Sequence, residues 1–575
     1  MKNIKLIIVL SILVLLSCDD EVDINPQGLI TNDLIVNNQE TVSGYLTAAY
    51  GMLDGNFDGA DPWRGAASNW IYGEVASDNA YKGSTNSDQP QINEVERYNA
   101  TSTSDYMDYK YNAVYEGVAR SNRTIREATN GLSSGDLSQS DFNQLVGEAR
   151  FLRGHYHFEA KKMWNKIAYI DENVSESITN TTDDSIWVSI EEDFQSTIDL
   201  LEETSEIGRT NSWIASAYLA KAHIYQGDFD SARPILDNII NSGPYDLNDR
   251  FSDNFNAIFD NSRESIFAVQ YVVGEGVPND QTGNWGDVLN FPQTGDVGAG
   301  CCGFYQPSQN LVNAFKTDAD GLPLLDTFND VDVLNEEAQF NAFLAANGGE
   351  AEGYDETFEL ESGNLDPRLD RTVGRRGIDY NGFGLHPGRD WIRDMSNGGP
   401  YLPKKSMYRA DQIGMVSSTV AWSANVNAIN VNIIRFAEVL LWRAEIAAFD
   451  GDLGTAVQLV DRVRTRASNS DDFVTVPGST TPAANYLVGN YGSFESQEQA
   501  IAAVEHEQRI ELAMEGNRFF ELVRKGTAIE VLNEYIDGEK DTRSYLENSI
   551  FEAQDEFYRF PQTIIDQSSG VLTPN

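Results

Sequence analysis

The chain has 575 residues, of which 89 are Asp or Glu and 41 are Lys or Arg, giving a formal net charge of −48. This charge argues against nucleic-acid binding, because phosphates require a positive protein surface, and against charge-driven attachment to an anionic lipid face. Polyanionic ligands are disfavoured but stay open, because a local basic patch can override the field of the whole molecule.

The first 17 residues have the form of a secretory signal peptide. Lys2 and Lys5 precede an apolar run from Leu6 to Leu16, which is too short for a membrane-spanning helix of about 20 residues. Ser17 and Cys18 then resemble a lipoprotein cleavage site. We therefore expect residues 1–17 to be removed, Cys18 to carry the acyl anchor, and residues 18–38 to form the lead-in to the fold.

Residues 39–243 are predicted to form a first block of helical repeats. Apolar residues recur there at helical spacing, which indicates amphipathic helices. The expected helices cover residues 39–53, 111–130, 141–164, 187–203, 211–225 and 230–241.

From residue 244 to 430 the helical periodicity fades, and Gly, Asn, Asp and aromatic residues dominate. A structureless stretch of this length is improbable inside a compact domain. We expect a loop-rich insertion with short elements, and we place the ligand-binding surface in it.

Cys301 and Cys302 are adjacent, so a bridge between them would be strained, since disulfides usually span longer Cα distances. We favour that vicinal disulfide, with two reduced thiols as the alternative.

A second helical block is expected from residue 431 to 575, ending in an irregular tail whose docking is in doubt. It opens with a predicted helix from Val431 to Asp450, with Arg435, Glu438, Arg443 and Glu445 mostly off its buried face. Gly451 then breaks the helix, and a second helix follows. The segment 449–456 aligns without gaps on 225–232, and this aromatic-x-Gly-Asp turn is typical of a tetratricopeptide-type hairpin. The fold class is therefore mainly α, a helical-hairpin scaffold carrying a large irregular insertion.

Seven sequence segments together resemble the SusD/RagB family of surface lipoproteins from Bacteroidota. The two strongest are IIRFAEVLLWRAEIAAFDGD and EQRIELAMEGNRFFELVRKG, the latter at 507–526. The others, in the family's order, are EVASDNAYKG, GEARFLRGHYHF, QPSQNLVNAF, LDPRLDRTVG and FYRFPQTIID.

The resemblance implies a non-catalytic, lipid-anchored protein of the outer membrane that faces the cell exterior. Members bind glycans and act as a lid over a SusC-like TonB-dependent transporter. Two alternatives stay open: a peptide-binding or purely structural lid of the transporter, and a glycoside hydrolase.

We expect no cofactor and no metal. The segment from Gly298 to Gly303 satisfies G-x-G-x-x-G but lacks the strand and helix that a dinucleotide site requires. His155 and His157 are two residues apart on a predicted helix, so they point in different directions. Asp318 and Asp320 match part of a calcium-binding loop, but Lys316 occupies the position of its first ligand, so we expect a plain surface turn.

Aromatic residues in the loops are the better signal, because aromatic rings can stack on the C–H faces of sugars. Trp164, Trp187, Trp213 and Trp442 lie in predicted repeat helices, so we expect them in the core, and Trp70 is also expected to be structural. The predicted glycan contacts are stacking by Trp63, Tyr81, Trp285, Tyr305 and Trp391, with Asp61 and Arg389 binding hydroxyls. The acidic chain favours a neutral glycan, and we expect a β-glucan of the laminarin type.

Overall fold

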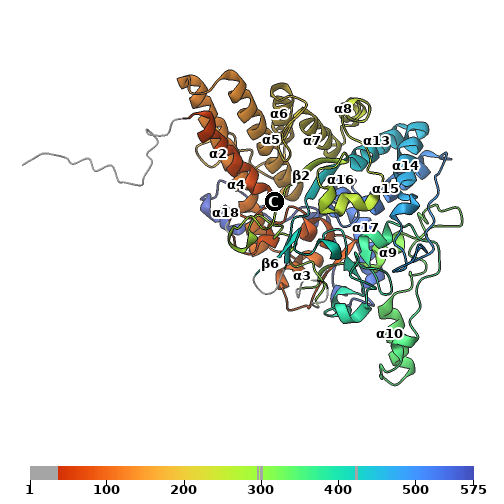
Figure 1. The fold of residues 1–575 in the computed structure, drawn as a ribbon. Coiled ribbons are helices and arrows are strands. Elements are labelled where there is room, and N and C mark those ends of the chain that lie inside the picture. Colours follow the sequence, from red (N-terminus) through yellow and green to blue (C-terminus); the bar gives the residue numbers. More distant parts are fainter. Residues whose placement is uncertain (1–36, 58, 294–296, 298–301, 421–424) are drawn as a thin grey trace, which may run out of the picture.

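The computed structural model describes residues 37–575 apart from 58, 294–296, 298–301 and 421–424. The expected signal peptide, Cys18 and Cys301 lie outside the described residues. In Figure 1 the long helices form one side of the molecule, and shorter elements joined by loops form the other. Over the described ranges, no helix combines the length and the apolar character needed to cross a membrane.

The first block is built from long helices that pack on their neighbours in chain order. All six expected helices are present, and the second of them begins six residues earlier than expected. A short helix, α3 (Pro90–Glu96), precedes it. The helices are α2 (Gln39–Tyr50), α4 (Asp105–Ser134), α5 (Gln139–Trp164), α6 (Ser185–Leu200), α7 (Ser212–Tyr225) and α8 (Phe229–Ser242).

The second block repeats the hairpin of α7 and α8. Gly227 and Gly451 both adopt a left-handed backbone, with φ of 69° and 76°, which glycine does without a steric penalty. The aspartate after each glycine caps the next helix. The two hairpins stack, and the rings of Phe229 and Phe449 lie 5.5 Å apart. This confirms the tetratricopeptide-like scaffold. The helices of this block are α13 (Phe436–Asp450), α14 (Leu453–Ala467), α15 (Gln497–Leu512), α16 (Arg518–Arg524), α17 (Ala528–Glu539) and α18 (Gln562–Gln567).

The start of α13 differs from the sequence expectation. Residues Val431–Arg435 form strand β8, not the first turn of a helix. β8 pairs antiparallel with β2 (Ser265–Val269). Its β-branched residues suit a strand, and the partner that decides the conformation lies far away in the sequence.

The charged residues of α13 are also placed differently from expectation. Glu438, Arg443 and Glu445 are all buried, because the helix is covered on every side. Their charges are satisfied by other segments: Glu445 by Arg524 at 2.7 Å and Arg443 by Asp237 at 2.7 Å. Glu438 lies 3.7 Å from Lys221 on α7.

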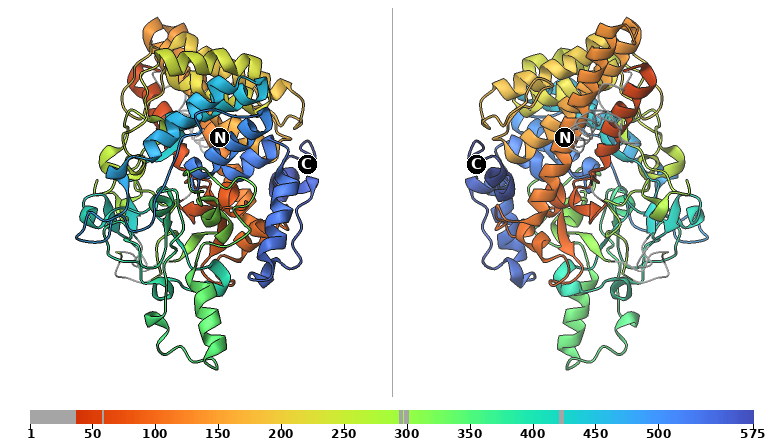
Figure 2. Two further views of the ribbon diagram at one scale, coloured as in Figure 1. Left: turned by 90° about the vertical axis from the view of Figure 1, so that its right-hand side faces the viewer. Right: turned by 90° about the vertical axis from the view of Figure 1, so that its left-hand side faces the viewer.

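Between residues 244 and 430 the elements are short and irregular. Each strand pairs in a two-stranded antiparallel sheet, and the pairs are β1–β3, β2–β8, β4–β5 and β6–β7. One helix, α10, projects from the body (Figure 2). Strand β1 (Ala80–Gly83) comes from the first block and pairs with β3. The elements of the insertion not yet given are β3 (Phe304–Pro307), α9 (Gln309–Ala314), α10 (Glu336–Ala346), α11 (Leu369–Thr372), β4 (Val373–Gly374), α12 (Met395–Gly398), β5 (Leu402–Pro403), β6 (Ser417–Thr419) and β7 (Asn425–Asn427).

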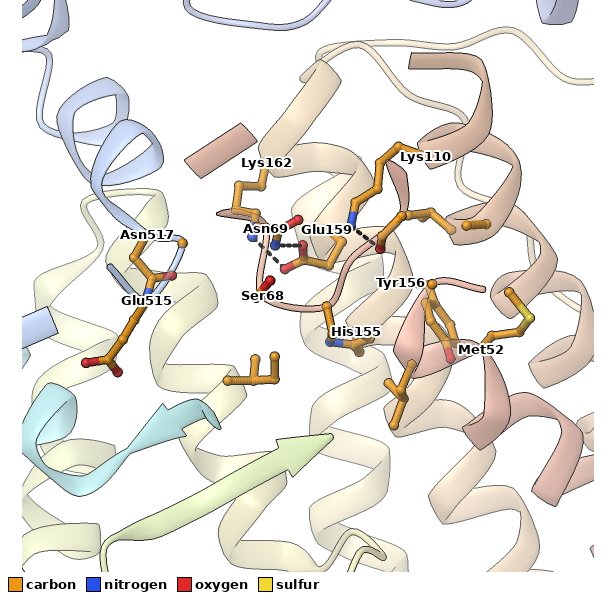
Figure 3. Close-up of a pocket in the computed structure, with 18 of the residues that line it drawn as sticks. Met52, Ser68, Asn69, Lys110, His155, Tyr156, Glu159, Lys162, Glu515 and Asn517 are labelled. Atoms are coloured by element: carbon orange, nitrogen blue, oxygen red, sulfur yellow. Dashed lines mark hydrogen bonds and ion pairs between the residues drawn. The ribbon is translucent and has the colours of Figure 1, made fainter. Parts of the chain in front are cut away.

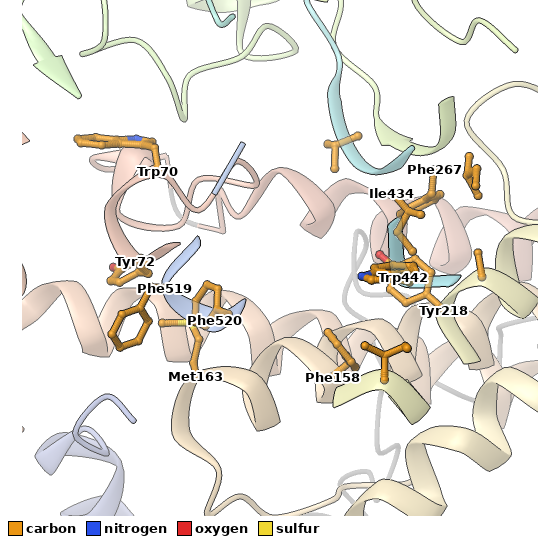
Figure 4. Packing of buried hydrophobic residues seen from close by; sticks show 14 of the residues in the cluster. Trp70, Tyr72, Phe158, Met163, Tyr218, Phe267, Ile434, Trp442, Phe519 and Phe520 are labelled. Atoms are coloured by element: carbon orange, nitrogen blue, oxygen red, sulfur yellow. The ribbon is translucent and has the colours of Figure 1, made fainter. Parts of the chain in front are cut away.

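One large core joins segments from the whole chain. Figure 4 shows Trp70 and Phe158 from the first block, Phe267 from β2, and Trp442 and Phe519 from the second block in one packed region. As expected, Trp70, Trp164, Trp213 and Trp442 are part of this core, and Trp187 is partly buried and packs against it. The two helical blocks therefore share one core, and the insertion also has a smaller apolar cluster of its own, which includes Phe291, Tyr380 and Trp391.

The tail is docked, which resolves the doubt raised by the sequence. The Tyr558 amide donates to the Met163 carbonyl at 2.9 Å. The Asn575 side chain donates to the Tyr558 carbonyl at 2.6 Å and accepts from the Phe560 amide at 2.9 Å. The tail thus closes over the C-terminal end of α5.

Candidate functional site

A polar cavity lies where α4, α5 and α7 meet β8 and the 515–517 turn (Figure 3). Lys110 donates to the Gly65 carbonyl at 3.0 Å, and Glu159 accepts from Lys162 at 2.7 Å and from Asn69 at 3.1 Å. Burial alone would raise the pKa of Glu159, but Lys162, His155 and Lys110 lower it to about 2.

This cavity is too small for a ligand the size of a sugar. Its volume is about 40 Å³, against roughly 300–1,000 Å³ for typical small-molecule sites, so it has room for a few water molecules. The Asn69 side-chain oxygen is buried and has no protein partner, and water would satisfy it. The cavity is best explained as a hydrated part of the core.

Four of the predicted stacking residues are buried, so the expectation that their rings are exposed is wrong. The exposed fraction is 4% for Trp63, 0% for Tyr81, 3% for Tyr305 and 7% for Trp391. Loops rich in Gly, Asn and Asp contain few aliphatic residues. Their large rings therefore supply the apolar surface that the loops bury. Trp63 and Tyr305 pack into the main core, and Trp391 and Tyr81 pack into two smaller clusters.

The contacts of these rings show how each is held. Tyr81 lies in β1, and its hydroxyl donates to Glu539 at 2.8 Å while Arg543 covers its ring. Tyr305 packs against Trp70, with the ring centres 5.6 Å apart.

Trp63 and Trp391 are held in a similar way. The Trp63 indole donates to the Tyr106 hydroxyl at 3.2 Å. The Trp391 ring centre lies 5.6 Å from that of Tyr380 and 5.1 Å from that of His386.

The other predicted residues are not fully buried. Trp285 is half-buried, and its indole donates to the Asn279 and Asp280 carbonyls at 3.2 Å. Asp61 pairs with Arg64. Arg389 binds both carboxylate oxygens of Asp355 at 2.9 and 3.1 Å and packs over the rings of Phe340 and Tyr354. This arrangement fixes the base of α10.

Cys302 takes part in a disulfide bond. Its partner lies outside the described residues, and the pairing with Cys301 stays a prediction.

Several loops that carry the predicted residues contact one another. Arg393 donates to the Ser84 hydroxyl at 2.8 Å and pairs with Asp88. The Ser84 amide donates to the Gly303 carbonyl, and the Trp70 indole donates to the Gly286 carbonyl at 3.0 Å. We call the partly exposed or exposed side chains that these loops carry the loop face: Asp61, Arg64, Asp88, Gln89, Trp285 and Arg393.

The loop face contains residues that the sequence analysis did not select. Arg64 and Arg393 flank the predicted Trp63 and Trp391, so a search for charged neighbours of loop aromatics would have found them. Asp88 gives no comparable signal, because its partner Arg393 is about 300 residues away. The loop backbone is constrained: Asp61, Ser84 and Gln89 have φ of 50°, 54° and 46°. Such left-handed conformations in residues other than glycine concentrate at functional sites.

A second, larger hollow lies between the 98–102 loop and the tail. Its volume is about 440 Å³. We call it the tail groove, and it is lined by Tyr98, Asn99, Ala100, Thr101, Ser102, Gln554, Asp555, Arg559, Phe560, Gln562, Ile565, Pro574 and Asn575.

Two family models match the chain. One, described as the SusD family, matches residues 263–572. The other, described as starch-binding and associating with the outer membrane, matches residues 30–225. The first alone covers more than half of the sequence.

Related sequences and solved structures agree with these matches. A SusD-like protein of Formosa agariphila is 21% identical over 563 residues, which are 92% of this chain and 93% of that protein. A match of 24% identity to a SusD-like protein of Bacteroides ovatus covers 191 residues, 30% of this chain and only 35% of that protein.

Among solved structures, a SusD superfamily protein from Bacteroides vulgatus has a TM-score of 0.67 at 19% identity, covering 93% of this chain and 98% of that one. Surface glycan-binding protein A from Bacteroides thetaiotaomicron, in complex with laminarihexaose, has a TM-score of 0.65 at 20% identity, covering 93% of this chain and 99% of that one. At these identities the likeness establishes the fold.

Proposed function

The chain belongs to the SusD family, and from that premise we propose that it is a cell-surface glycan-binding protein. It captures oligosaccharide or polysaccharide without cleaving it and passes the ligand to a SusC-like TonB-dependent transporter. The observation that carries this proposal is the SusD family match over residues 263–572. The fold likeness to a glycan-binding protein solved in complex with laminarihexaose supports it.

We place the glycan on the loop face. Trp285 offers a partly exposed ring for stacking, and the Asp88–Arg393 and Asp61–Arg64 pairs offer acceptors and donors to sugar hydroxyls. These pairs add no net charge. Because the chain as a whole carries −48, a neutral glycan meets no long-range repulsion. We propose a β-glucan of the laminarin type.

Affinity gels containing laminarin, other neutral glycans, alginate or a sulfated glycan test this proposal. We expect laminarin to retard the wild type and Arg462→Ala, an exposed arginine on α14, to the same degree. Trp285→Ala and Arg393→Ala should each weaken binding about five- to thirtyfold, because each removes a direct contact worth roughly 1–2 kcal/mol. Retardation by anionic glycans alone would overturn the neutral ligand. No retardation in any gel would favour a peptide-binding or structural lid.

The same purified protein tests the absence of cleavage. We expect no reducing ends to be released from laminarin over many hours. Release that depends on a carboxylate of the protein would instead identify a glycoside hydrolase.

We also propose that acylated Cys18 anchors the protein to the outer membrane with its fold facing the exterior. The Cys18→Ala protein should lose its acyl group and leave the membrane fraction, because a stable lipid anchor depends on the acyl chains. Protease added to intact cells should degrade the wild-type protein. Retention of Cys18→Ala in the membrane fraction would contradict the anchor assignment.

A further inference from the structure

We propose that the tail groove is a second binding site for neutral oligosaccharide, and that one long glycan can occupy it together with the loop face. This inference rests on the proposed function and adds to it a second site with its own residues. The tail groove is about 440 Å³, within the range of small-molecule sites, whereas the core cavity is about 40 Å³.

The lining of the tail groove suits a sugar chain. Tyr98 is partly exposed and contributes ring surface, whereas Phe560 is buried beneath the groove. Asn99, Thr101 and Gln562 contribute amide and hydroxyl groups. The charged side chains in the lining, those of Asp555 and Arg559, lie 3.6 Å apart and balance each other. A mixture of ring surface and neutral hydrogen-bonding groups matches a chain of hydroxyl-bearing rings better than it matches an ion.

An extended peptide is a poorer occupant. Peptides that bind in extended form usually add a strand to an exposed sheet edge. The described elements that line the tail groove are the 3₁₀ turn Ala553–Asp555, helix α18 and connecting loops, and they include no strand.

The walls of the tail groove are fixed before any ligand binds. The Gln562 amide donates to the Ser102 carbonyl at 2.8 Å, which ties the tail to the 98–102 loop. Asn575 is held by Tyr558 and Phe560, as described above. A preformed site loses little conformational entropy on binding.

Helix α3 connects the tail groove to the loop face. Gln89, on the loop face, immediately precedes α3, and Tyr98, in the tail groove, lies two residues beyond its end. Seven helical residues span roughly 10 Å. Arg97 lies between the two sites and donates to Asn86 at 2.7 Å. A polysaccharide bound at the loop face would therefore hold its next sugars at high effective concentration beside the tail groove.

A pair of substitutions in the 98–102 loop tests this inference. Thr101 and Thr103 are both exposed, and only Thr101 lines the tail groove. Thr101→Arg should block the groove, and Thr103→Arg is the matched control. A second variant, Arg559→Ala, removes a lining side chain that is one-third exposed, so it should fold normally.

Isothermal titration with laminarihexaose, cellohexaose and mannohexaose measures the number of sites. We expect two sites per protein in the wild type and Thr103→Arg, and one site in Thr101→Arg. Arg559→Ala should weaken one of the two sites, and Arg393→Ala should weaken the other. For long laminarin, Thr101→Arg should lower affinity at least about tenfold, because avidity is lost.

The outcomes separate this inference from the proposed function. If the wild type binds at one site, and Thr101→Arg and Arg559→Ala bind like the wild type, the tail groove is not a glycan site while the proposed function stands. If no hexasaccharide or polysaccharide binds the wild type, both proposals are overturned.

Discussion

At the scale of single residues, His157 shows how burial fixes a protonation state. The Ile170 amide donates to Nε2 at 3.0 Å, so Nε2 carries no proton, and Nδ1 donates to the Arg153 carbonyl at 3.1 Å. Burial, together with the nearby Arg153 guanidinium, lowers the pKa of His157 to about 3. The imidazole is therefore neutral in the folded protein well below the pH at which it becomes protonated in the unfolded chain.

We therefore predict that protonation of His157 makes the folded protein less stable in acid. The folded pKa lies below the unfolded value of about 6.5, so the unfolded chain binds the proton first, and stability falls as pH drops from 6.5 towards 3. Urea unfolding gives the free energy of unfolding of the wild type and of His157→Gln. We expect the difference between these two free energies to decrease by about 2–3 kcal/mol from pH 7 to pH 4.5. A difference that stays constant over this range would contradict the neutral tautomer.

At the scale of elements, the hairpin turns are the part that local sequence determines. Gly451 ends α13 in a left-handed conformation, and the Asp452 side chain caps α14 by accepting from the Thr455 amide at 3.1 Å. Both effects depend on residues within a few positions of one another. The same chemistry at Gly227 and Asp228 explains why the repeat could be recognised before the structure was known.

Two glycine substitutions should therefore have opposite effects. A Cβ at Gly451 or at Gly538 in α17 would meet no other atom within 4 Å, so neither change creates a clash. Gly451→Ala should destabilise by about 1 kcal/mol, because alanine is strained at positive φ. Gly538→Ala should stabilise by about 0.5–1 kcal/mol, because alanine is the better helix former. Thermal unfolding measures the stability change caused by each substitution. If both substitutions stabilised or both destabilised the protein, the backbone conformations at Gly451 and Gly538 would be contradicted.

The elements that sequence analysis missed depend on distant partners. β8 has its conformation set by pairing with β2, more than 150 residues earlier. The buried charges of α13 are compensated by residues on α7, α8 and α16. The aromatic residues of the loops were expected on the surface, because composition shows that a loop is irregular but not which side chains cover the core. Of the loop face, only Asp61 and Trp285 were predicted from the sequence.

At the scale of the whole molecule, a buried network of charges joins the insertion to the second block. Glu511 on α15 accepts from Arg368 at 2.8 Å and also pairs with Arg435 and Arg466. Burial alone would raise the pKa of Glu511, but the three guanidinium groups hold it well below its usual range. Removing one member of such a network leaves uncompensated charge in the core.

Glu511→Gln should consequently destabilise the whole protein by about 3–5 kcal/mol. The loss should appear as one cooperative transition at lower temperature in calorimetry, because the core is shared by both blocks. Asp537→Asn, which breaks the exposed pair with Lys540, is the control and should change the melting temperature little. Two separated transitions in Glu511→Gln would show that the blocks unfold independently.

The docked tail has a consequence for how the protein is made. Residues 558–575 complete the packing around the C-terminal end of α5, which is synthesised some 400 residues earlier. Nascent chains emerge at about 5–20 residues per second. The tail that completes the packing of the first helices is therefore synthesised tens of seconds after them. During this interval the apolar surface of these helices stays exposed and must be kept from aggregating. A chain released before the tail is synthesised would keep this surface exposed, and we expect it to be degraded.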